Sequence, residues 1–553
     1  MYQEMSLMNV LKKLECHLSQ ILIDEFKIDL NLLEKTQFSL NTDKSKQTFG
    51  DISANCALII SQITKAPPRE IAEKIKESFH HLNVERIEIA GPGFLNFFLT
   101  KDAFKTLAQE LYAEGEGFFA HGSQPKSYCV EFVSANPTGP LHFGHGRGGI
   151  IGDVLSHILS FLGHRVTKEF YINDAGNQIQ KLGISFKIRC LQVAGQNADL
   201  PEDGYQGEYL VTLAQKAFNE MGNNLLVQND EFYANYAKEH LLKEIVQTLK
   251  EYGIDYDVWF SEKTLHDSGA IEAALKKISS HLYDEDGALW LRTTALGDDK
   301  DRVVKKKTGE LTYIAADIAY LQNKMDRDFD HLIYILGQDH HSYLQRLKIV
   351  MEVLGYKADR LDVILYQLVT IKESGLAVRL SKRTGRIITL DDIIRTVGKD
   401  VARFFYLHTK ADAHLDFDIE LALKHTDENP VYYIQYAYVR TKSIRVKAQQ
   451  DERFHAITLS DCAYIDEPEW LLLKKIAFLA ELLSSIEKNY QTHKLTYYAI
   501  ELAQTFHTYY SQHKVIDIDS IEISRARLLI VELVGNTLKT TFELLGISAP
   551  ERM

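Results

Sequence analysis

VEFVSANPTGPLHFGHGRGGIIGD, residues 130–153, is the stretch from which the fold of this chain can be read. It begins with an apolar run typical of a buried strand, and the prolines and glycine that follow prevent both helix and strand. From Ile150 the apolar residues recur at helical spacing, and Gly163 suits a left-handed cap at the helix end. Residues 165–172 then read as a second strand. The stretch therefore predicts a β-α-β unit with two histidines at the start of its helix.

These two histidines, His142 and His145, lie where a helix presents unpaired N–H groups and the positive end of its dipole. Such a position favours phosphate, and the two rings add hydrogen-bond donors. Gly144 between them has no side chain, so a flat ring can approach the backbone there. The combination predicts a site for a nucleotide triphosphate.

The same letters also allow a dinucleotide fingerprint, because Gly144, Gly146 and Gly149 spell G-x-G-x-x-G and Glu169 follows about twenty residues later. In that fingerprint the first glycine follows the strand almost directly. Here a proline-containing segment separates Val133 from Gly144. We therefore favour the triphosphate site.

The composition is that of a large globular protein, with 553 residues, 45% of them hydrophobic and 25% charged. The five cysteines are scattered, so neither a disulfide framework nor a thiolate zinc site is indicated. A net charge of −13 argues against indiscriminate nucleic-acid binding, whereas a selective RNA partner needs only local basic patches. Because the sequence has neither a long apolar run nor a signal-peptide pattern, we expect a cytoplasmic protein without membrane association.

Three regions differ in their patterns and predict an α/β protein with two further domains. Residues 1–115 predict an N-terminal α+β module, followed by a glycine-rich linker at 115–124. Residues 116–425 contain the β-α-β unit and predict a Rossmann-like parallel-sheet catalytic domain, in which about 183–297 is a helical insertion. Residues 426–553 carry long amphipathic stretches with short connections and predict an antiparallel α-helical bundle.

Polar residues follow two other predicted strands, at 173–177 and at 337–341. Open α/β sheets bind ligands at the carboxyl ends of their strands, although the segment 173–177 is equally typical of a helix cap. The second segment contains Asp339, His340 and His341, a weak metal pattern because these neighbours lack a further Cys or His partner. In the helix predicted from Tyr313, Asp317 either meets a ligand or pairs within the helix.

The segment VRLSKRTGR, residues 378–386, is strongly basic and is either an exposed loop or a clamp on polyphosphate. Tyrosines crowd the predicted bundle helices at 429–449 and 495–513. Most such aromatics are core residues, and a minority can stack on unpaired bases.

Taken together, the histidine pair and the basic loop resemble the signatures of class I aminoacyl-tRNA synthetases. HFGH at 142–145 stands where that class has its HIGH motif, and RLSKR at 379–383 resembles its KMSKS loop. The resemblance narrows to arginyl-tRNA synthetases through four runs, SANPTGPLHFGHGR at 134–147, YINDAGNQ at 171–178, NPVYYIQYAYVR at 429–440 and LGISAPERM at 545–553.

This resemblance implies ATP-dependent ligation of L-arginine to tRNA(Arg) through an arginyl-adenylate, with release of AMP and diphosphate. ATP is then a substrate that brings Mg²⁺, and no cofactor is permanently bound. The family is generally monomeric and generally needs bound tRNA to activate arginine. The bundle would bind the anticodon stem and loop, and the N-terminal module would touch the tRNA elbow.

The resemblance also implies roles for individual residues, and no metal ligands. The residues expected to bind ATP are His142, Gly144, His145, Arg379 and Lys382. Those expected to serve catalysis are His142, His145, Ser381 and Lys382. Those expected to bind arginine are Glu131, Ser134, Asn136, Tyr313, Asp317 and Gln338. Those expected to contact tRNA are Tyr436 and Arg440. Arg379 replaces the first lysine of the family motif and preserves its charge but not its shape.

Two other functions are compatible with parts of the sequence. A small HxGH nucleotidylyltransferase would use the same histidine pair but would leave the predicted bundle unexplained. A non-catalytic tRNA-binding paralogue would be expected to lose His142, His145 and Lys382 first, and all three are present.

Overall fold

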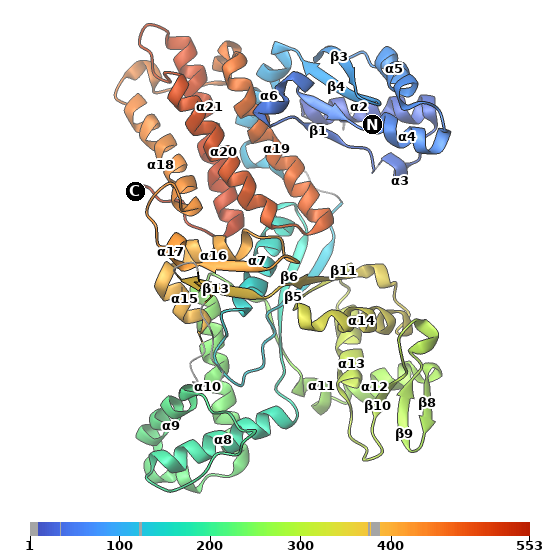
Figure 1. The fold of residues 1–553 in the computed structure, drawn as a ribbon, viewed down its shortest axis with the longest axis vertical. Coiled ribbons are helices and arrows are strands. Elements are labelled where there is room, and N and C mark those ends of the chain that lie inside the picture. Colours follow the sequence, from blue (N-terminus) through green and yellow to red (C-terminus); the bar gives the residue numbers. More distant parts are fainter. Residues whose placement is uncertain (1–8, 34, 121–123, 374–375, 378–387) are drawn as a thin grey trace.

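The computed structural model describes residues 9–33, 35–120, 124–373, 376–377 and 388–553. Figure 1 shows the N-terminal module beside the helical bundle, a central sheet below them, and two lobes beneath that sheet. No helix in this described part is both long and apolar enough to span a membrane.

The N-terminal module is the α+β unit that the sequence predicts. Its antiparallel sheet has the strand order β1-β2-β4-β3. The strands are β1 (Phe38–Leu40), β2 (Ile52–Ala54), β3 (Val84–Ala90) and β4 (Phe94–Leu99), and the helices are α2 (Val10–Phe26), α3 (Leu30–Leu33), α4 (Cys56–Thr64), α5 (Pro68–Ser78) and α6 (Lys101–Glu114). The predicted linker at 115–124 is only partly a linker, because Phe118 and Phe119 bury their rings in the short helix η2 (Gly115–Phe119).

The central sheet is parallel throughout, with the strand order β12-β11-β5-β6-β7. Its strands are β5 (Ser127–Phe132), β6 (Arg165–Ile172), β7 (Val258–Ser261), β11 (His331–Gly337) and β12 (Leu361–Tyr366). Helix α7 (His145–Phe161) connects β5 to β6, and Gly163 follows it at φ 90°. The predicted β-α-β unit is therefore confirmed.

The stretch 183–297 is not one helical insertion, and this prediction was wrong in its extent. Helices α8 (Asn177–Val193), α9 (Glu208–Met221) and α10 (Asp230–Glu251) do form a lobe around their own core, which includes Phe186 and Tyr233. Strand β7 then returns to the central sheet beside β6. Its four residues are too short to show alternation, so the flanking helical patterns hid it.

The second lower lobe contains a small antiparallel sheet of strand order β10-β9-β8. These strands share one hydrophobic core with helices that pack on the central sheet. Its elements are α11 (Lys263–Asp267), α12 (Ala270–Lys277), β8 (Leu282–Glu285), β9 (Ala288–Leu291), β10 (Arg302–Lys305), α13 (Tyr313–Asp326) and α14 (His341–Val353). Beyond β12 a three-stranded sheet of order β14-β13-β15 follows. Its strands are β13 (Val369–Glu373), β14 (Leu376–Ala377) and β15 (Leu415–Asp418). The helices in this part of the chain are α15 (Leu390–Val397), α16 (Lys399–Leu407) and α17 (Ile419–Ala422).

The C-terminal region is the predicted helical bundle. Its helices are α18 (Pro430–Ala448), α19 (Glu467–Asn489), α20 (His493–Gln512) and α21 (Ile521–Leu545). Tyr438, Tyr498 and Tyr509 are buried in its core, whereas Tyr497 and Tyr510 are exposed. The crowded tyrosines therefore divide between packing and surface.

Candidate active site

The candidate site lies at the carboxyl ends of the central strands, where the chain leaves β5 and enters α7. At this exit Val133 has φ 67° and Ser134 has φ 41°, a left-handed conformation that non-glycine residues rarely adopt. Such strain costs on the order of 1–3 kcal/mol per residue and is typical of functional sites. The turn also places the Ser134 hydroxyl, which donates to Glu131 Oε1 at 3.1 Å and accepts from the Tyr171 backbone N–H at 3.1 Å.

Two backbone hydrogen bonds hold the histidine pair in one tautomer. The Gly144 N–H donates to His142 Nδ1 at 3.0 Å, and the His142 N–H donates to His145 Nδ1 at 3.0 Å. Because each Nδ1 accepts, each neutral ring carries its proton on Nε2. A Cβ at Gly144 would lie 2.9 Å from His142 Nδ1, so the absence of a side chain allows this fold-back.

His145 is an uncharged donor at neutral pH. Burial of the ring, together with a smaller effect of the neighbouring His142, lowers the pKa of His145 to about 4. The ring centroids of the two histidines are 5.9 Å apart at the start of α7. The pair can therefore offer N–H donors to an anion together with the helix N-terminus.

Three carboxyl groups from different elements lie close enough to one another to interact electrostatically. Asp317 on α13 accepts a hydrogen bond from the Tyr343 hydroxyl at 2.6 Å. Burial raises the pKa of Asp317 to about 7, although the Tyr343 hydroxyl and the Arg346 charge lower it, and the nearby charges of Glu262 and Glu131 add a smaller rise. Burial also raises the pKa of Glu262, which follows the end of β7 and is 6% exposed. Such a region favours a cationic ligand, because a cation would relieve the repulsion among the carboxylates.

Glu131 is already paired within the protein. Its Oε2 accepts from Lys324 Nζ at 2.5 Å and from the Tyr320 hydroxyl at 2.9 Å. Burial alone would lower the pKa of Lys324, but the Glu131 carboxylate raises it well above its usual value. The Tyr320 hydroxyl also lies 2.6 Å from Glu169 Oε1, so its single proton is shared between two buried carboxylates. Glu131 thus binds Lys324 through Oε2, while its Oε1 accepts from Ser134.

The other predicted arginine ligands are exposed at the same edge of the sheet. Asn136 donates to Gln178 at 2.9 Å, Gln338 begins the short helix η6 (Gln338–His340), and Tyr313 is 74% exposed at the start of α13. The structure therefore brings Glu131, Ser134 and Asp317 together and leaves Asn136, Tyr313 and Gln338 at the rim.

The predicted residues of the basic loop, Arg379, Ser381 and Lys382, lie outside the described residues. The chain immediately after that loop is paired with the histidine motif. The Phe143 N–H donates to the Ile388 carbonyl at 3.2 Å, and the Leu390 N–H donates to the Leu141 carbonyl at 2.8 Å. The histidine motif and the segment that begins at Ile388 are therefore neighbours.

Sequence reasoning missed Glu262 as a member of the site. An acidic residue at the carboxyl end of a strand is the signal that could have identified it. The helical patterns that flank the four-residue β7 obscure this signal. For the weak metal pattern, the side chains of His340 and His341 are outside the described part, in which no group of three potential metal ligands occurs.

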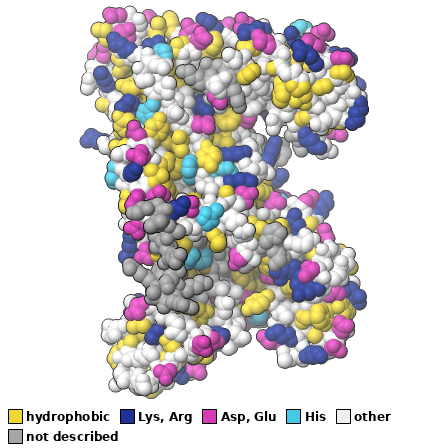
Figure 2. Space-filling model, in the orientation of Figure 1, with side chains coloured by type: hydrophobic (Ala, Val, Ile, Leu, Met, Phe, Trp, Pro, Cys, Tyr) yellow, Lys and Arg dark blue, Asp and Glu magenta, His cyan; other side chains and the backbone are white. Residues whose placement is uncertain are grey.

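A second candidate surface lies on the bundle, where aromatic rings and an arginine form a ladder across α18 and α20. Tyr436 stacks with Tyr432 at 6.4 Å and with His507 at 5.7 Å. The Arg440 guanidinium lies 4.7 Å from the Tyr436 ring centre and 5.0 Å from that of the exposed Tyr510. Figure 2 shows positive and negative side chains intermixed over one face of the molecule. For binding a nucleic acid, the residues of a local surface therefore matter more than the net charge of the chain.

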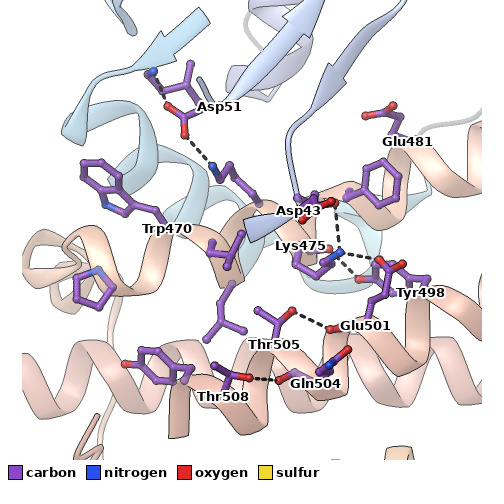
Figure 3. A pocket seen from close by; sticks show the side chains of 18 of the residues that line it. Asp43, Asp51, Trp470, Lys475, Glu481, Tyr498, Glu501, Gln504, Thr505 and Thr508 are labelled. Carbon is purple, nitrogen blue, oxygen red and sulfur yellow. Dashed lines mark hydrogen bonds and ion pairs between the residues drawn. The ribbon is translucent and has the colours of Figure 1, made fainter. Parts of the chain in front are cut away.

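A cavity of about 1290 Å³ lies between the N-terminal module and the bundle (Figure 3). Of two ion pairs in its lining, the first crosses between the two domains and the second lies within the bundle. Lys474 Nζ lies 2.8 Å from Asp51, and Lys475 Nζ lies 2.7 Å from Glu501. The Lys474–Asp51 pair in its lining therefore helps to join the two domains. Neither histidine of the pair lines this cavity.

Comparison with protein families accounts for nearly the whole chain. A family described as "tRNA synthetases class I (R), catalytic domain" matches residues 107–405. The "Arginyl tRNA synthetase N terminal domain" family matches residues 9–99, and the "DALR anticodon binding domain" family matches residues 434–553.

Individual relatives are similar over the same length. The arginine–tRNA ligase of Bacillus velezensis is 40% identical over 541 residues, which cover 96% of this chain and 96% of the relative. That of Carboxydothermus hydrogenoformans is 42% identical over 535 residues, with 95% and 96% covered. The solved structure of the Thermus thermophilus arginyl-tRNA synthetase superposes with a TM-score of 0.76 at 21% identity, covering 98% of this chain and 100% of that one.

Proposed function

The chain belongs to the arginyl-tRNA synthetase family of class I aminoacyl-tRNA synthetases, and from this we propose how its residues divide the reaction. The enzyme ligates arginine to tRNA at the expense of ATP. In this chemistry the arginine carboxylate attacks the α-phosphorus of ATP, pyrophosphate leaves, and the arginyl group then passes to tRNA. The protein supplies positioning and charge stabilisation and needs no nucleophile of its own.

We propose that His142 and His145 donate from Nε2 to the triphosphate at the start of α7, and that Gly144 lets adenine approach. Lys382 stabilises the charge on the departing pyrophosphate, while Ser381 shapes the loop and Arg379 binds phosphate. Mg²⁺ arrives as the counter-ion of ATP, since this ion usually keeps substrate phosphates among its ligands. The fixed tautomers of both histidines support this division of roles.

For arginine, we propose that Asp317 and Glu262 accept hydrogen bonds from the guanidinium. A guanidinium has five N–H donors in a planar fork, so two carboxylates from different directions suit it better than one. Ser134 and the paired Glu131 would face the α-amino group, and Asn136, Tyr313 and Gln338 would cover the bound amino acid from the rim. The observation that carries this proposal is the raised pKa of Asp317 beside Glu262.

The test is ATP–pyrophosphate exchange with each amino acid in turn, with and without total tRNA. We expect exchange with arginine alone and only when tRNA is present. Exchange with a different amino acid would contradict the pocket assignment. Absence of exchange in a preparation that binds tRNA would favour the non-catalytic paralogue, which the full-length similarity to ligases does not favour.

The pKa of Asp317 predicts a pH dependence of arginine binding. With a pKa of about 7 in the empty site, the carboxyl is mostly protonated at pH 6 and mostly ionised at pH 8. Arginine needs the ionised form, so KM for arginine should rise about tenfold as the pH falls across this range. Steady-state exchange kinetics with tRNA present would measure it. The same titration of Asp317→Asn should be flat, and a parallel slope in that variant would assign the effect to another group.

We propose that the ladder of Tyr436 and Arg440 contacts unpaired bases of tRNA. Stacking on such a surface is worth about 1–3 kcal/mol per base. Arg440→Ala should therefore raise KM for tRNA about tenfold while KM for arginine stays unchanged. Arg453→Ala is the matched control, since Arg453 is an arginine of the same domain that pairs with Asp451 at 2.6 Å. Equal losses in the two variants would contradict a specific contact.

We propose domain boundaries near residues 115 and 425, with the N-terminal module touching the tRNA elbow and the bundle holding the anticodon arm. We further propose that the enzyme acts as a monomer in the cytoplasm. A single sedimenting species at the mass of one chain, and at the mass of one chain plus one tRNA when tRNA is added, would support the monomer.

A further inference from the structure

Arg147 lies in the first turn of α7, two residues after His145, and its side chain is completely buried. Its guanidinium donates to four backbone carbonyls. These are Gln367 at 2.9 Å, Ala413 at 2.8 Å, Lys410 at 2.8 Å and Thr409 at 3.4 Å. Burial lowers the pKa of Arg147 to about 10, so the group stays charged at neutral pH and its hydrogen bonds are charge-assisted.

The four carbonyls belong to two loops at one end of the β14-β13-β15 sheet. Gln367 precedes β13, and residues 409–413 precede β15. The two loops also bond to each other, since the Gln367 N–H donates to the Ala411 carbonyl at 2.8 Å. β13 pairs with β14, whose last residue, Ala377, directly precedes the basic loop 378–387.

Close packing at the same joint leaves little room for adjustment. A Cβ at Gly148 would lie 2.6 Å from the ring of Tyr366, the last residue of β12. The chain after the basic loop is already paired with the histidine motif through Phe143 and Ile388. Arg147 therefore provides a corresponding connection for the start of β13, the strand that pairs with β14 ahead of the basic loop.

We infer that Arg147 is a positioning residue, which fixes the sheet that leads into the Lys382 loop against the helix that carries His145. It touches neither arginine nor ATP and acts through the placement of the loop. The inference rests on the role proposed for Lys382. Lysine at this position keeps the charge, but its three N–H donors are on one nitrogen atom. It therefore cannot bond to four carbonyls spread over two loops.

The test is a double-mutant cycle of Arg147→Lys and Lys382→Ala in arginine-dependent ATP–pyrophosphate exchange with tRNA. Arg147→Lys alone should lower kcat about 30-fold and change KM for arginine less than about threefold. In the Lys382→Ala background the same substitution should lower kcat less than about threefold, because the effects of substituting residues that act as a unit are not additive. The same fold-change in both backgrounds, or a loss mainly in KM for arginine, would overturn the inference.

Arg403→Lys is the matched control, because Arg403 is also a buried arginine bonded to backbone carbonyls. It donates to the carbonyls of Leu545 at 2.9 Å and Tyr252 at 2.8 Å and to the Asp153 carboxylate at 2.6 Å, and all three partners lie outside the β14-β13-β15 sheet. Arg403→Lys should lower kcat by the same factor in the wild-type background and in the Lys382→Ala background. Non-additivity equal to that of Arg147 would show a general effect on folding and would refute the specific role.

Amide hydrogen exchange gives a readout that is independent of activity. Arg147→Lys, or Arg147→Gln as a second variant, should accelerate exchange in β13 and β15 and leave β5 and β6 unchanged. Uniform acceleration, or global unfolding of both variants, would make Arg147 an ordinary core residue. A wild-type enzyme without arginine-dependent exchange would instead refute the proposed function, which the hydrogen-exchange result does not depend on.

Discussion

Asp317→Asn is expected to lower kcat/KM for arginine by about 10²–10³, because it removes the charged acceptor and leaves a guanidinium without its partner in a half-buried pocket. Losing one member of such a pair costs on the order of 3–5 kcal/mol, and about 1.4 kcal/mol corresponds to a tenfold change. KM for ATP should stay within about threefold of its wild-type value, because the contacts proposed for ATP come from the histidine motif and the basic loop and not from α13. Steady-state exchange with tRNA present would measure both constants.

Two comparisons separate a lost contact from a general disturbance. Citrulline, which is the uncharged analogue of arginine, should inhibit the wild type and the variant about equally, so that selectivity for arginine over citrulline collapses. Asp362→Asn is the control, since Asp362 lies on β12 and hydrogen-bonds to His331 at 2.8 Å and Tyr490 at 3.0 Å. If both variants lose arginine affinity alike, Asp317 is not the guanidinium ligand.

His145→Ala is expected to lower kcat for adenylate formation by about 10²–10³, the usual cost of removing one donor from developing negative charge. The loss should appear in kcat more than in KM for arginine. Because the pKa of His145 is about 4, the ring stays neutral and the rate should show no step from this group between pH 6 and pH 8. Single-turnover formation of the adenylate with tRNA present would measure the rate directly.

Substitution by the two amides tests which ring nitrogen matters. Glutamine places an N–H donor near the position of Nε2 and should recover to within about tenfold of the wild type. Asparagine can replace Nδ1 as the acceptor for the His142 N–H but offers no donor at Nε2, so it should be as slow as alanine. Recovery by asparagine rather than glutamine would show that the ring acts by shaping the turn.

The sequence by itself determined the parts whose physical signals are local. The buried strand, proline-rich turn and capped helix around His142 and His145 follow from residue spacing, and the structure confirms them. The long helices of the bundle and the α+β module were likewise predictable, because amphipathic periods of that length are hard to mistake. The histidine motif and the longer runs also gave the family.

Only the tertiary structure decided which charges meet. Strand β7 is a four-residue edge strand whose place depends on pairing with β6, so Glu262 could not be recognised as a neighbour of Asp317. Tyr320 shares a helix with Asp317, yet its hydroxyl bonds to Glu131 and Glu169. Arg147 looked like one more basic residue of a motif until folding enclosed it among four carbonyls. In each case the partner is far away in sequence, and neither spacing nor propensity contains that information.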